Sequence, residues 1–308
     1  MQIYENAALS PFHRPASKLG RFVSRYGIHD AQGRRIRHYP ILVSLDSSWP
    51  YQPRRLPVDC YDRLPGEWIY CGLLRGQFGH FITECLPNLI TAARARRSYP
   101  DAPIIAHTFL EIDVDDWKAR NAKLLDYFCD RIGLDLSNLH FVRSPVMAEK
   151  LIMPDAPFRK KFHYQPWLWE EIDQIWDHPD HGEKLYLSRA RFDATGSARV
   201  FEEDRIEDIF TEYGYRIVYL EDHDLDTQLR LVAGAPAIAG PQGSALHWSL
   251  YSRHCTSVLS LGFRSHLQRG ICQGRGQAYR EIAGKKVRGG PYRLRRIDTA
   301  ELRAALDT

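Results

Sequence analysis

Residues 237–248 read AIAGPQGSALHW, and this segment carries the strongest indication of the fold. A short apolar strand ends in the turn Gly-Pro-Gln-Gly, and a helix is expected to begin at Ser244. The free amides and dipole of such a helix start favour a bound phosphate by roughly 0.3–1 kcal/mol. Two interpretations stay open: a phosphate-binding turn, or a turn that packs a strand tightly against a helix.

The flanking sequence alternates between apolar strands and amphipathic helices. Around the glycine turn, strands are expected at 184–188, 215–220, 237–240 and 257–261, with helices at 202–213, 224–235 and 243–251. Earlier in the chain, a strand from residue 68 precedes a helix at 80–97, strands at 103–107, 139–143 and 151–153, and a helix at 116–132. This alternation predicts parallel sheets, which bind ligands beyond the carboxyl ends of their strands.

The length of 308 residues suits one large or two modest domains. We expect an α/β fold of two Rossmann-like halves, with residues 1–66 an irregular entry that holds one strand at 39–45. The predicted organisation is an N-terminal α/β domain at 1–160, a connector at 161–183, a C-terminal Rossmann-like domain at 184–262 and a basic segment at 263–308.

Composition excludes several classes of protein. Hydrophobic residues make up 44% and charged residues 26%, as in ordinary globular chains. No apolar run approaches the roughly 20 residues of a membrane span, and the first 15 residues do not resemble a secretory signal, so a cytoplasmic location is expected. The six cysteines form no C-x-x-C pair, which favours reduced thiols over a zinc site.

The net charge of +4 is concentrated near the end of the chain. Residues 263–308 contain eleven Lys or Arg against four Asp or Glu, which predicts a basic appendage. Such a segment attracts nucleic acid, anionic lipid head groups or a polyanionic substrate. The segment has few aromatic residues on which the bases of a nucleic acid could stack, so nucleic acid is not the expected partner.

Two further motifs carry candidate chemistry. Ser188 and Arg189 end the strand at 184–188, where a guanidinium reaches a diphosphate near Gly243 or forms a surface ion pair. On the helix at 80–97, His80 and Glu84 share a polar stripe expected to face away from the core. They are either a general base with its partner, or a cap and ion pair on a wet face.

Two D-x-D sequences, at 113–115 and 224–226, match the metal-binding pattern of some sugar transferases. Both precede apolar periodic helices, where Asp is an ordinary N-cap. We therefore predict no metal site.

Taken together, the order of these motifs resembles glycosyltransferase family 61. The segment HFITECLPNL at 80–89 is similar to the family's H-[WF]-x-x-E-x-L-P-x-L helix, and Ser188-Arg189, RVFEE at 199–203, Gln228 and GPQGSA at 240–245 follow in the family's order. Gln242 replaces the usual His of the glycine turn, and His247 replaces the usual Asn after the turn. These departures are typical of a divergent member. The members that the chain resembles are those of bacterial capsule and polysaccharide biosynthesis.

The resemblance implies a GT-B fold and an inverting, metal-independent transfer of a sugar from a nucleotide-sugar donor to a glycan or lipid-linked saccharide acceptor. It implies that residues 1–160 form the acceptor-side domain and that residues 184–262 form the nucleotide-sugar domain. It also implies Glu84 or His80 as the base. The donor-binding residues it implies are Ser188, Arg189, Arg199, Gly240, Pro241, Gln242, Gly243, Ser244, Ala245 and His247.

Other functions remain open from the sequence alone. A relative that binds nucleotide or glycan without catalysis would explain Gln242, and a nucleic-acid-binding protein would explain the basic segment. That segment either packs back onto the first domain or makes a peripheral contact with the inner membrane surface.

Overall fold

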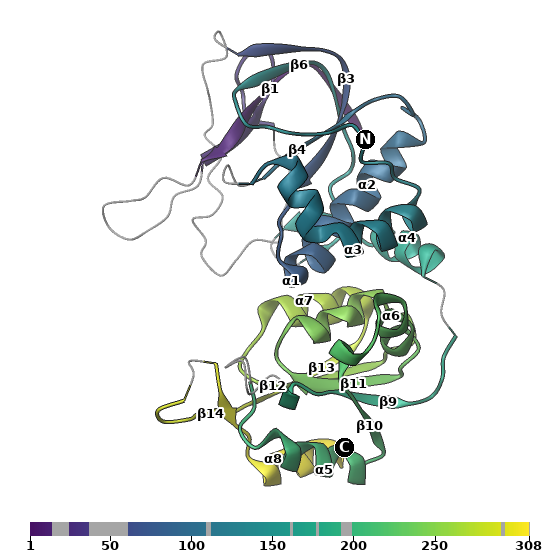
Figure 1. Cartoon of the computed structure of the whole chain (residues 1–308), viewed down its shortest axis with the longest axis vertical. Coiled ribbons are helices and arrows are strands. Elements are labelled where there is room, and N and C mark those ends of the chain that lie inside the picture. The colour runs from purple at the N-terminus through teal and green to yellow at the C-terminus, as the bar shows by residue number, and fades with distance from the viewer. Residues whose placement is uncertain are drawn as a thin grey trace. The chain divides into compact units, whose positions relative to one another are not determined.

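The computed structural model describes residues 1–13, 25–36, 61–108, 112–160, 163–176, 179–191, 199–290 and 293–307. The strand expected at 39–45 lies outside these residues. The chain divides into two compact units, Met1–Leu168 and Trp169–Thr308, called unit 1 and unit 2 below. The division falls within helix α4 (Trp167–Ile175) (Figure 1). In the described part of the chain, no helix is both long and apolar enough to span a bilayer.

Unit 1 is built on a mixed six-stranded sheet in the order β2-β1-β6-β3-β4-β5. Its strands are β1 (Gln2–His13), β2 (Arg25–His29), β3 (Asp62–Leu73), β4 (Ile104–His107), β5 (Leu139–Phe141) and β6 (Val146–Met153). The last four are parallel, whereas β1 is antiparallel to both of its neighbours. The expectation of an irregular entry over 1–66 was therefore wrong, because β1 pairs with β6 along most of its length.

The helices of unit 1 follow β3 and β4. The first of them runs without a break through α1 (Phe78–His80), a π-helical turn (Phe81–Cys85) and α2 (Leu86–Arg96). The second, α3 (Val114–Ile132), is capped by Asp113 and ends at Gly133 in the left-handed conformation. A small hairpin of β7 (Phe158–Lys160) and β8 (His163–Tyr164) completes the unit.

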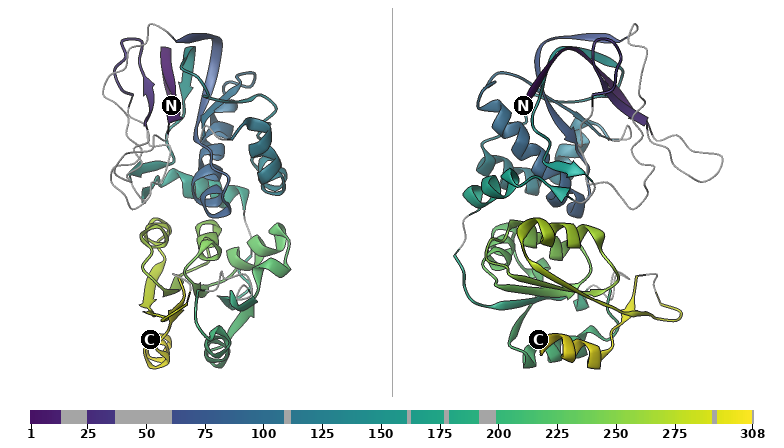
Figure 2. Two further views of the ribbon diagram at one scale, coloured as in Figure 1. Left: turned by 60° about the vertical axis from the view of Figure 1, so that its left-hand side comes forward. Right: turned by 180° about the vertical axis from the view of Figure 1, so that it is seen from behind.

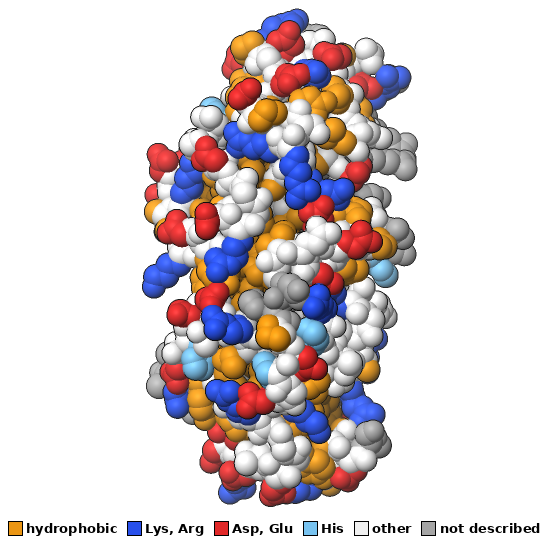
Figure 3. Space-filling model, turned by 90° about the vertical axis from the view of Figure 1, so that its right-hand side faces the viewer, with side chains coloured by type: hydrophobic (Ala, Val, Ile, Leu, Met, Phe, Trp, Pro, Cys, Tyr) orange, Lys and Arg blue, Asp and Glu red, His pale blue; other side chains and the backbone are white. Residues whose placement is uncertain are grey.

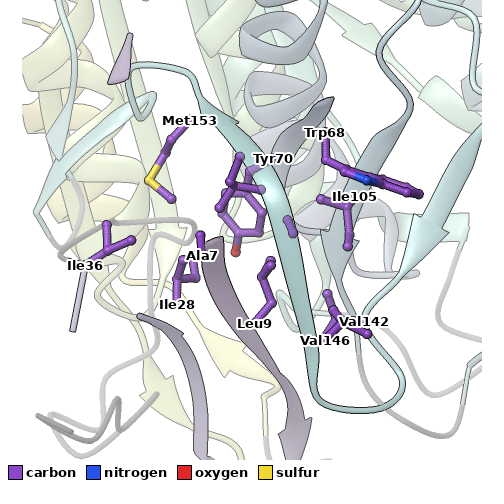
Figure 4. Close-up of a cluster of buried hydrophobic side chains, with 12 residues drawn as sticks. Ala7, Leu9, Ile28, Ile36, Trp68, Tyr70, Ile105, Val142, Val146 and Met153 are labelled. Carbon is purple, nitrogen blue, oxygen red and sulfur yellow. The ribbon is translucent and has the colours of Figure 1, made fainter. Parts of the chain in front are cut away.

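The core of unit 1 follows the two-residue period of its strands. Side chains two positions apart point to the same side, which places them in one cluster (Figure 4). The cluster includes Ala7, Leu9, Trp68, Tyr70, Val146 and Ala148. It anchors β3, so the loop that follows β3 at the carboxyl edge starts from a rigid strand.

Unit 2 contains an all-parallel five-stranded sheet in the order β10-β9-β11-β12-β13. The strands are β9 (Lys184–Leu187), β10 (Tyr215–Val218), β11 (Ala237–Pro241), β12 (Ser257–Gly262) and β13 (Ala278–Ala283). In chain order this is 2-1-3-4-5, a doubly wound arrangement whose direction reverses between β9 and β11. Such a reversal point is where α/β sheets bind ligands.

Helices cover both faces of this sheet. Helices α6 (Leu225–Ala233) and α7 (His266–Arg275) lie on one face, and α5 (Glu203–Glu212) and α8 (Thr299–Leu306) lie on the other (Figure 2). Two 3₁₀ helices, η3 (Leu220–Asp222) and η4 (Ser244–Tyr251), follow β10 and β11. Packing of Tyr186 on Phe210, with ring centroids 4.4 Å apart, joins β9 to α5 in the buried core.

The segment 263–308, expected as a basic appendage, belongs to unit 2. Strand β13 pairs in parallel with all six residues of β12. The short strands β14 (Lys285–Lys286) and β15 (Arg295–Arg296) form a hairpin, and the backbone of Arg295 bonds to that of Arg199 and Phe201. Basic and acidic side chains are interspersed on the face of the molecule in Figure 3.

Candidate functional site

The first cluster of candidate residues follows β3 in unit 1. Arg75 lies in the loop after β3, and His80 and Glu84 lie on the helix that the loop enters. Arg75 Nη1 is 3.3 Å from Glu84 Oε2 and 3.1 Å from His80 Nδ1, and His80 Nδ1 is 3.4 Å from Glu84 Oε2. Sequence analysis missed Arg75, because only the folded loop brings it to the other two.

His80 Nδ1 lies close to both charged groups. A guanidinium N–H only donates, so the 3.1 Å contact with Arg75 uses Nδ1 as an acceptor, whereas the 3.4 Å contact with Glu84 Oε2 uses a proton on Nδ1. Either tautomer of His80 therefore has a partner in this cluster. Glu84 presents a carboxylate that is paired with Arg75.

The polar stripe expected to face away from the core is buried from Glu84 onward, and only His80 at its start is partly exposed. The Glu84 side chain is 2% exposed, against 32% for His80. Asn88 and Thr91 on the next turns are buried as well. The ion pair on a wet face is therefore excluded, and Glu84 is a buried carboxylate paired with Arg75.

The π-helical turn explains how Glu84 reaches this position. The Leu86 amide donates to the Phe81 carbonyl, five residues earlier, so one extra residue enters the turn. The turn is held by neighbouring groups: the Tyr164 hydroxyl donates to the Thr83 carbonyl at 3.0 Å, and Thr83 Oγ1 donates to the Gly79 carbonyl at 2.7 Å. Turns of this kind occur frequently at functional sites.

The second cluster lies at the reversal point of the unit 2 sheet. Ser188 and Arg189 follow β9, and the glycine turn follows β11, its neighbour in the sheet. A methyl group on Gly243 would lie 3.6 Å from Arg189 Nη1. The two motifs that sequence analysis placed together are therefore side by side, and the space beside the guanidinium exists because residue 243 has no side chain. Burial lowers the pKa of Arg189.

Arg199 adds a second guanidinium to this edge of the sheet. Burial lowers its pKa, and the positive charges of Arg189 and Arg293 lower it further, as expected of neighbouring cations. The Arg199 carbonyl accepts from the amide of Arg295 at 2.9 Å, so the hairpin of the basic segment lies against residues 199–201.

The remaining residues of the glycine turn have different surroundings. Gly240 and Pro241 are buried within β11, and a methyl group on Gly240 would lie 2.8 Å from the Leu187 carbonyl. Gly240 is therefore explained by close strand packing. The Gln242 amide donates to the Leu261 carbonyl at 2.8 Å, while Ser244 and Ala245 begin η4 and are half-buried.

His247 points into unit 2 from η4. It is 6% exposed, and its Nδ1 lies 2.8 Å from Gln268 Oε1. Since Gln268 Nε2 donates to Ser249 Oγ at 2.8 Å, the Gln268 oxygen accepts and His247 Nδ1 carries a proton. This network orients the histidine below the glycine turn.

Glu203, which sequence analysis did not single out, is buried beneath Arg189. Its Oε1 accepts from the Arg189 amide at 2.8 Å and from the Tyr186 hydroxyl at 3.1 Å. Burial raises the pKa of Glu203 to about 7, and the charge of Glu207 adds to that rise. The available signal was the final Glu of the RVFEE segment.

The D-x-D sequences serve as helix caps. Asp113 Oδ1 accepts from the Asp116 amide at 2.7 Å and Asp224 Oδ1 from the Thr227 amide at 2.8 Å. Across the described residues, no group of three or more His, Cys, Asp or Glu is placed to hold a metal ion. Of the cysteines, Cys71, Cys85, Cys255 and Cys272 are buried free thiols.

Except for Arg75, the candidate residues of both clusters fall within one region of similarity to a known family. The sequence model of Glycosyltransferase 61 matches residues 78–259, which is more than half of the chain. The chain belongs to glycosyltransferase family 61. This confirms the resemblance seen in the motifs, and the matched region of the family 61 protein includes His80, Glu84, Arg189 and the glycine turn. No curated protein matches the chain.

Proposed function

We propose that this family 61 protein is an inverting glycosyltransferase that moves a sugar from a nucleotide-sugar donor to a glycan or lipid-linked saccharide acceptor in the synthesis of a surface polysaccharide. The observation that carries the proposal is the position of Arg189 beside Gly243 at the reversal point of the unit 2 sheet. This position brings a cation, an open glycine turn and the start of η4 together at the carboxyl edge of the unit 2 sheet.

Unit 2 holds the donor in this proposal. The amides of Gly243, Ser244 and Ala245 and the guanidinium of Arg189 bind the diphosphate, because backbone amides at a helix start and a fixed cation both favour phosphate oxygens. Arg199 supplies further positive charge. As the bond between sugar and phosphate breaks, these groups stabilise the negative charge that collects on the departing nucleoside diphosphate.

Unit 1 supplies the base. Arg75 donates to Glu84 Oε2, His80 lies beside the pair, and Glu84 offers the carboxylate that accepts a proton. Glu84 takes the proton of the acceptor hydroxyl as its oxygen attacks the anomeric carbon opposite the diphosphate. The new bond forms on that face, so the configuration inverts.

We propose in addition that the two units form a GT-B arrangement. The support is the division into two α/β units, each with parallel strands at its centre. The two clusters would then act on one substrate pair, the base from one unit and the diphosphate site from the other.

The test uses two variants with matched controls. Arg189→Ala should weaken binding of nucleoside diphosphates about tenfold or more, since a charge-assisted bond contributes about 1.5–3 kcal/mol. Arg191→Ala, which removes a half-exposed arginine paired with Asp222, should not. Binding would be measured by calorimetry and by thermal stabilisation across a panel of nucleotide sugars.

Glu84→Gln should lower turnover about a hundredfold or more, the usual contribution of a general base, and leave donor affinity unchanged. Glu67→Gln, on the exposed part of β3, is its control. Full turnover in Glu84→Gln would overturn the base assignment. Donor binding without turnover in the wild type would favour the catalytically inactive relative.

A further inference from the structure

Glu203 connects the diphosphate site to the helix behind it. It is the first residue of α5 and is 4% exposed. Its Oε1 accepts from the main-chain amide of Arg189, the residue whose guanidinium lies beside the glycine turn. The carboxyl group therefore fixes the point at which Arg189 leaves β9.

The second oxygen of this carboxyl group is different. Oε2 is buried, and among the described residues no group donates a hydrogen bond to it. A buried carboxylate oxygen without a donor is costly, whereas a proton on that oxygen removes the charge.

The charged and titratable groups around Glu203 come from three elements. On β9 and just after it are Tyr186, which donates to Oε1, and Arg189. Glu207 lies one turn along α5 and accepts from Ser188 and from Tyr219, the latter at 2.9 Å. The charge of Glu221 also acts on Arg189. Burial and the Glu207 charge raise the pKa of Glu203 to about 7, although the hydrogen bonds from Arg189 and Tyr186 and the charge of Arg189 act in the opposite direction.

We propose that Glu203 is a proton-linked positioning residue, which holds the backbone of Arg189 and takes up one proton on Oε2 from solvent when a diphosphate binds beside Arg189. The anion brings negative charge next to the buried carboxylate and so favours its neutral form. Protonation also removes one of the two acidic charges that act on Arg189, which strengthens its attraction for the ligand. The inference rests on the donor site proposed above.

The thermodynamic linkage between proton binding and diphosphate binding gives the direction in which affinity changes with pH. A ligand that raises the pKa of a group binds more tightly in the pH range where the group becomes protonated. Affinity for the diphosphate should therefore rise as the pH falls from 8.5 to 7. The phosphate groups of the ligand titrate as well, and this effect is common to wild type and variants.

The experiment is calorimetry of inorganic pyrophosphate binding to the full chain, in buffers of different ionisation enthalpy. At pH 8 the wild type should take up about half a proton more than Glu203→Gln, and between pH 8.5 and 7 its affinity should rise about fivefold more than that of the variant. Glu221→Gln removes an exposed charge near Arg189 and should keep the uptake of the wild type.

Tyr186→Phe provides a second variant in case Glu203→Gln fails to fold. It removes one hydrogen bond to the carboxylate and should move the range of proton uptake to higher pH. The role of Glu203 would be overturned, and the donor site would stand, in either of two cases. In the first, pyrophosphate binds with equal proton uptake in wild type and Glu203→Gln. In the second, the pH range of proton uptake is the same in Tyr186→Phe as in wild type. Absence of pyrophosphate binding to the wild type would overturn the donor site and this inference with it.

Discussion

The guanidinium of Arg75 lies 3.3 Å from the carboxylate of Glu84, a side chain that is 2% exposed. The two residues are separated by a loop and a helix start, and both side chains are largely shielded from water. A buried charge of this kind depends on its partner, because removal of one member leaves the other uncompensated.

Arg75→Met should therefore lower the free energy of unfolding by about 3 kcal/mol. In Arg75→Met combined with Glu84→Gln, neither charge remains, and much of this loss should be recovered. Urea denaturation of the wild type, both single variants and the double variant would measure the coupling. Additive effects of the two substitutions would show that the ion pair contributes nothing to stability.

Gly240 in β11 and Gly243 in the turn after it should respond differently to substitution by alanine. A methyl group on Gly243 would enter the space beside Arg189 at 3.6 Å, an ordinary contact, so Gly243→Ala should keep its melting temperature and lose affinity for pyrophosphate. A methyl group on Gly240 would meet the Leu187 carbonyl at 2.8 Å, so Gly240→Ala should unfold at lower temperature. Thermal melts with and without pyrophosphate separate the two, and equal stability of both variants would contradict the packing argument.

His107 should make the protein sensitive to acid. It is buried, its Nε2 donates to the Ser10 carbonyl at 2.9 Å, and its Nδ1 accepts from the Tyr70 hydroxyl at 2.8 Å. Burial lowers the pKa of His107 to about 4. Between that value and about 6.5 the unfolded chain binds the extra proton, so stability is lost as the pH falls through this range, by about 3 kcal/mol in total.

The measurement is the pH dependence of urea unfolding in wild type and His107→Gln. The variant lacks the titrating ring, so its stability should fall less between pH 6.5 and pH 4. Parallel pH profiles would show that His107 is not responsible.

Tyr164→Phe should loosen the π-helical turn. The hydroxyl is the donor to the Thr83 carbonyl, and a buried carbonyl left without it costs about 1–3 kcal/mol. We expect lower stability of unit 1 and faster amide hydrogen exchange in residues 81–85. If Glu84 is the base, turnover should fall with donor affinity unchanged. Unchanged exchange in the turn would contradict this role.

Much of unit 2 could be predicted because its strands and helices are short, regular and separated by turn residues. The expected helix at 202–213 is α5 at Glu203–Glu212, and the strand at 237–240 is β11. Strand β13 was missed because only Ile282 is buried in it, as expected at a sheet edge. Strand β1 was missed because two residues interrupt its alternation of apolar and polar side chains. They are Pro11 and Asn6, and Asn6 has a φ of 52°.

The candidate site was predicted in its parts and not in its contacts. The order of motifs named His80, Glu84, Arg189 and Gly243. The prediction that Glu84 faces away from the core was wrong for two reasons. The helical period of 3.6 residues does not hold across the π-helical turn, and the helix is buried on nearly all sides. Arg75 is found only by knowing where the loop after β3 leads.

The fifth strand of unit 2 lies beyond the region shared with the family. Strand β13 covers the edge of β12 with six paired residues, and it begins at Ala278, after the matched range ends at residue 259. An uncovered parallel strand presents a row of free amides and carbonyls that pair readily with another chain. During synthesis, β13 emerges from the ribosome after β12, so this edge stays open until residues 278–283 are available to pair. The basic segment therefore completes the sheet, and a nascent chain stalled before it would be prone to aggregate.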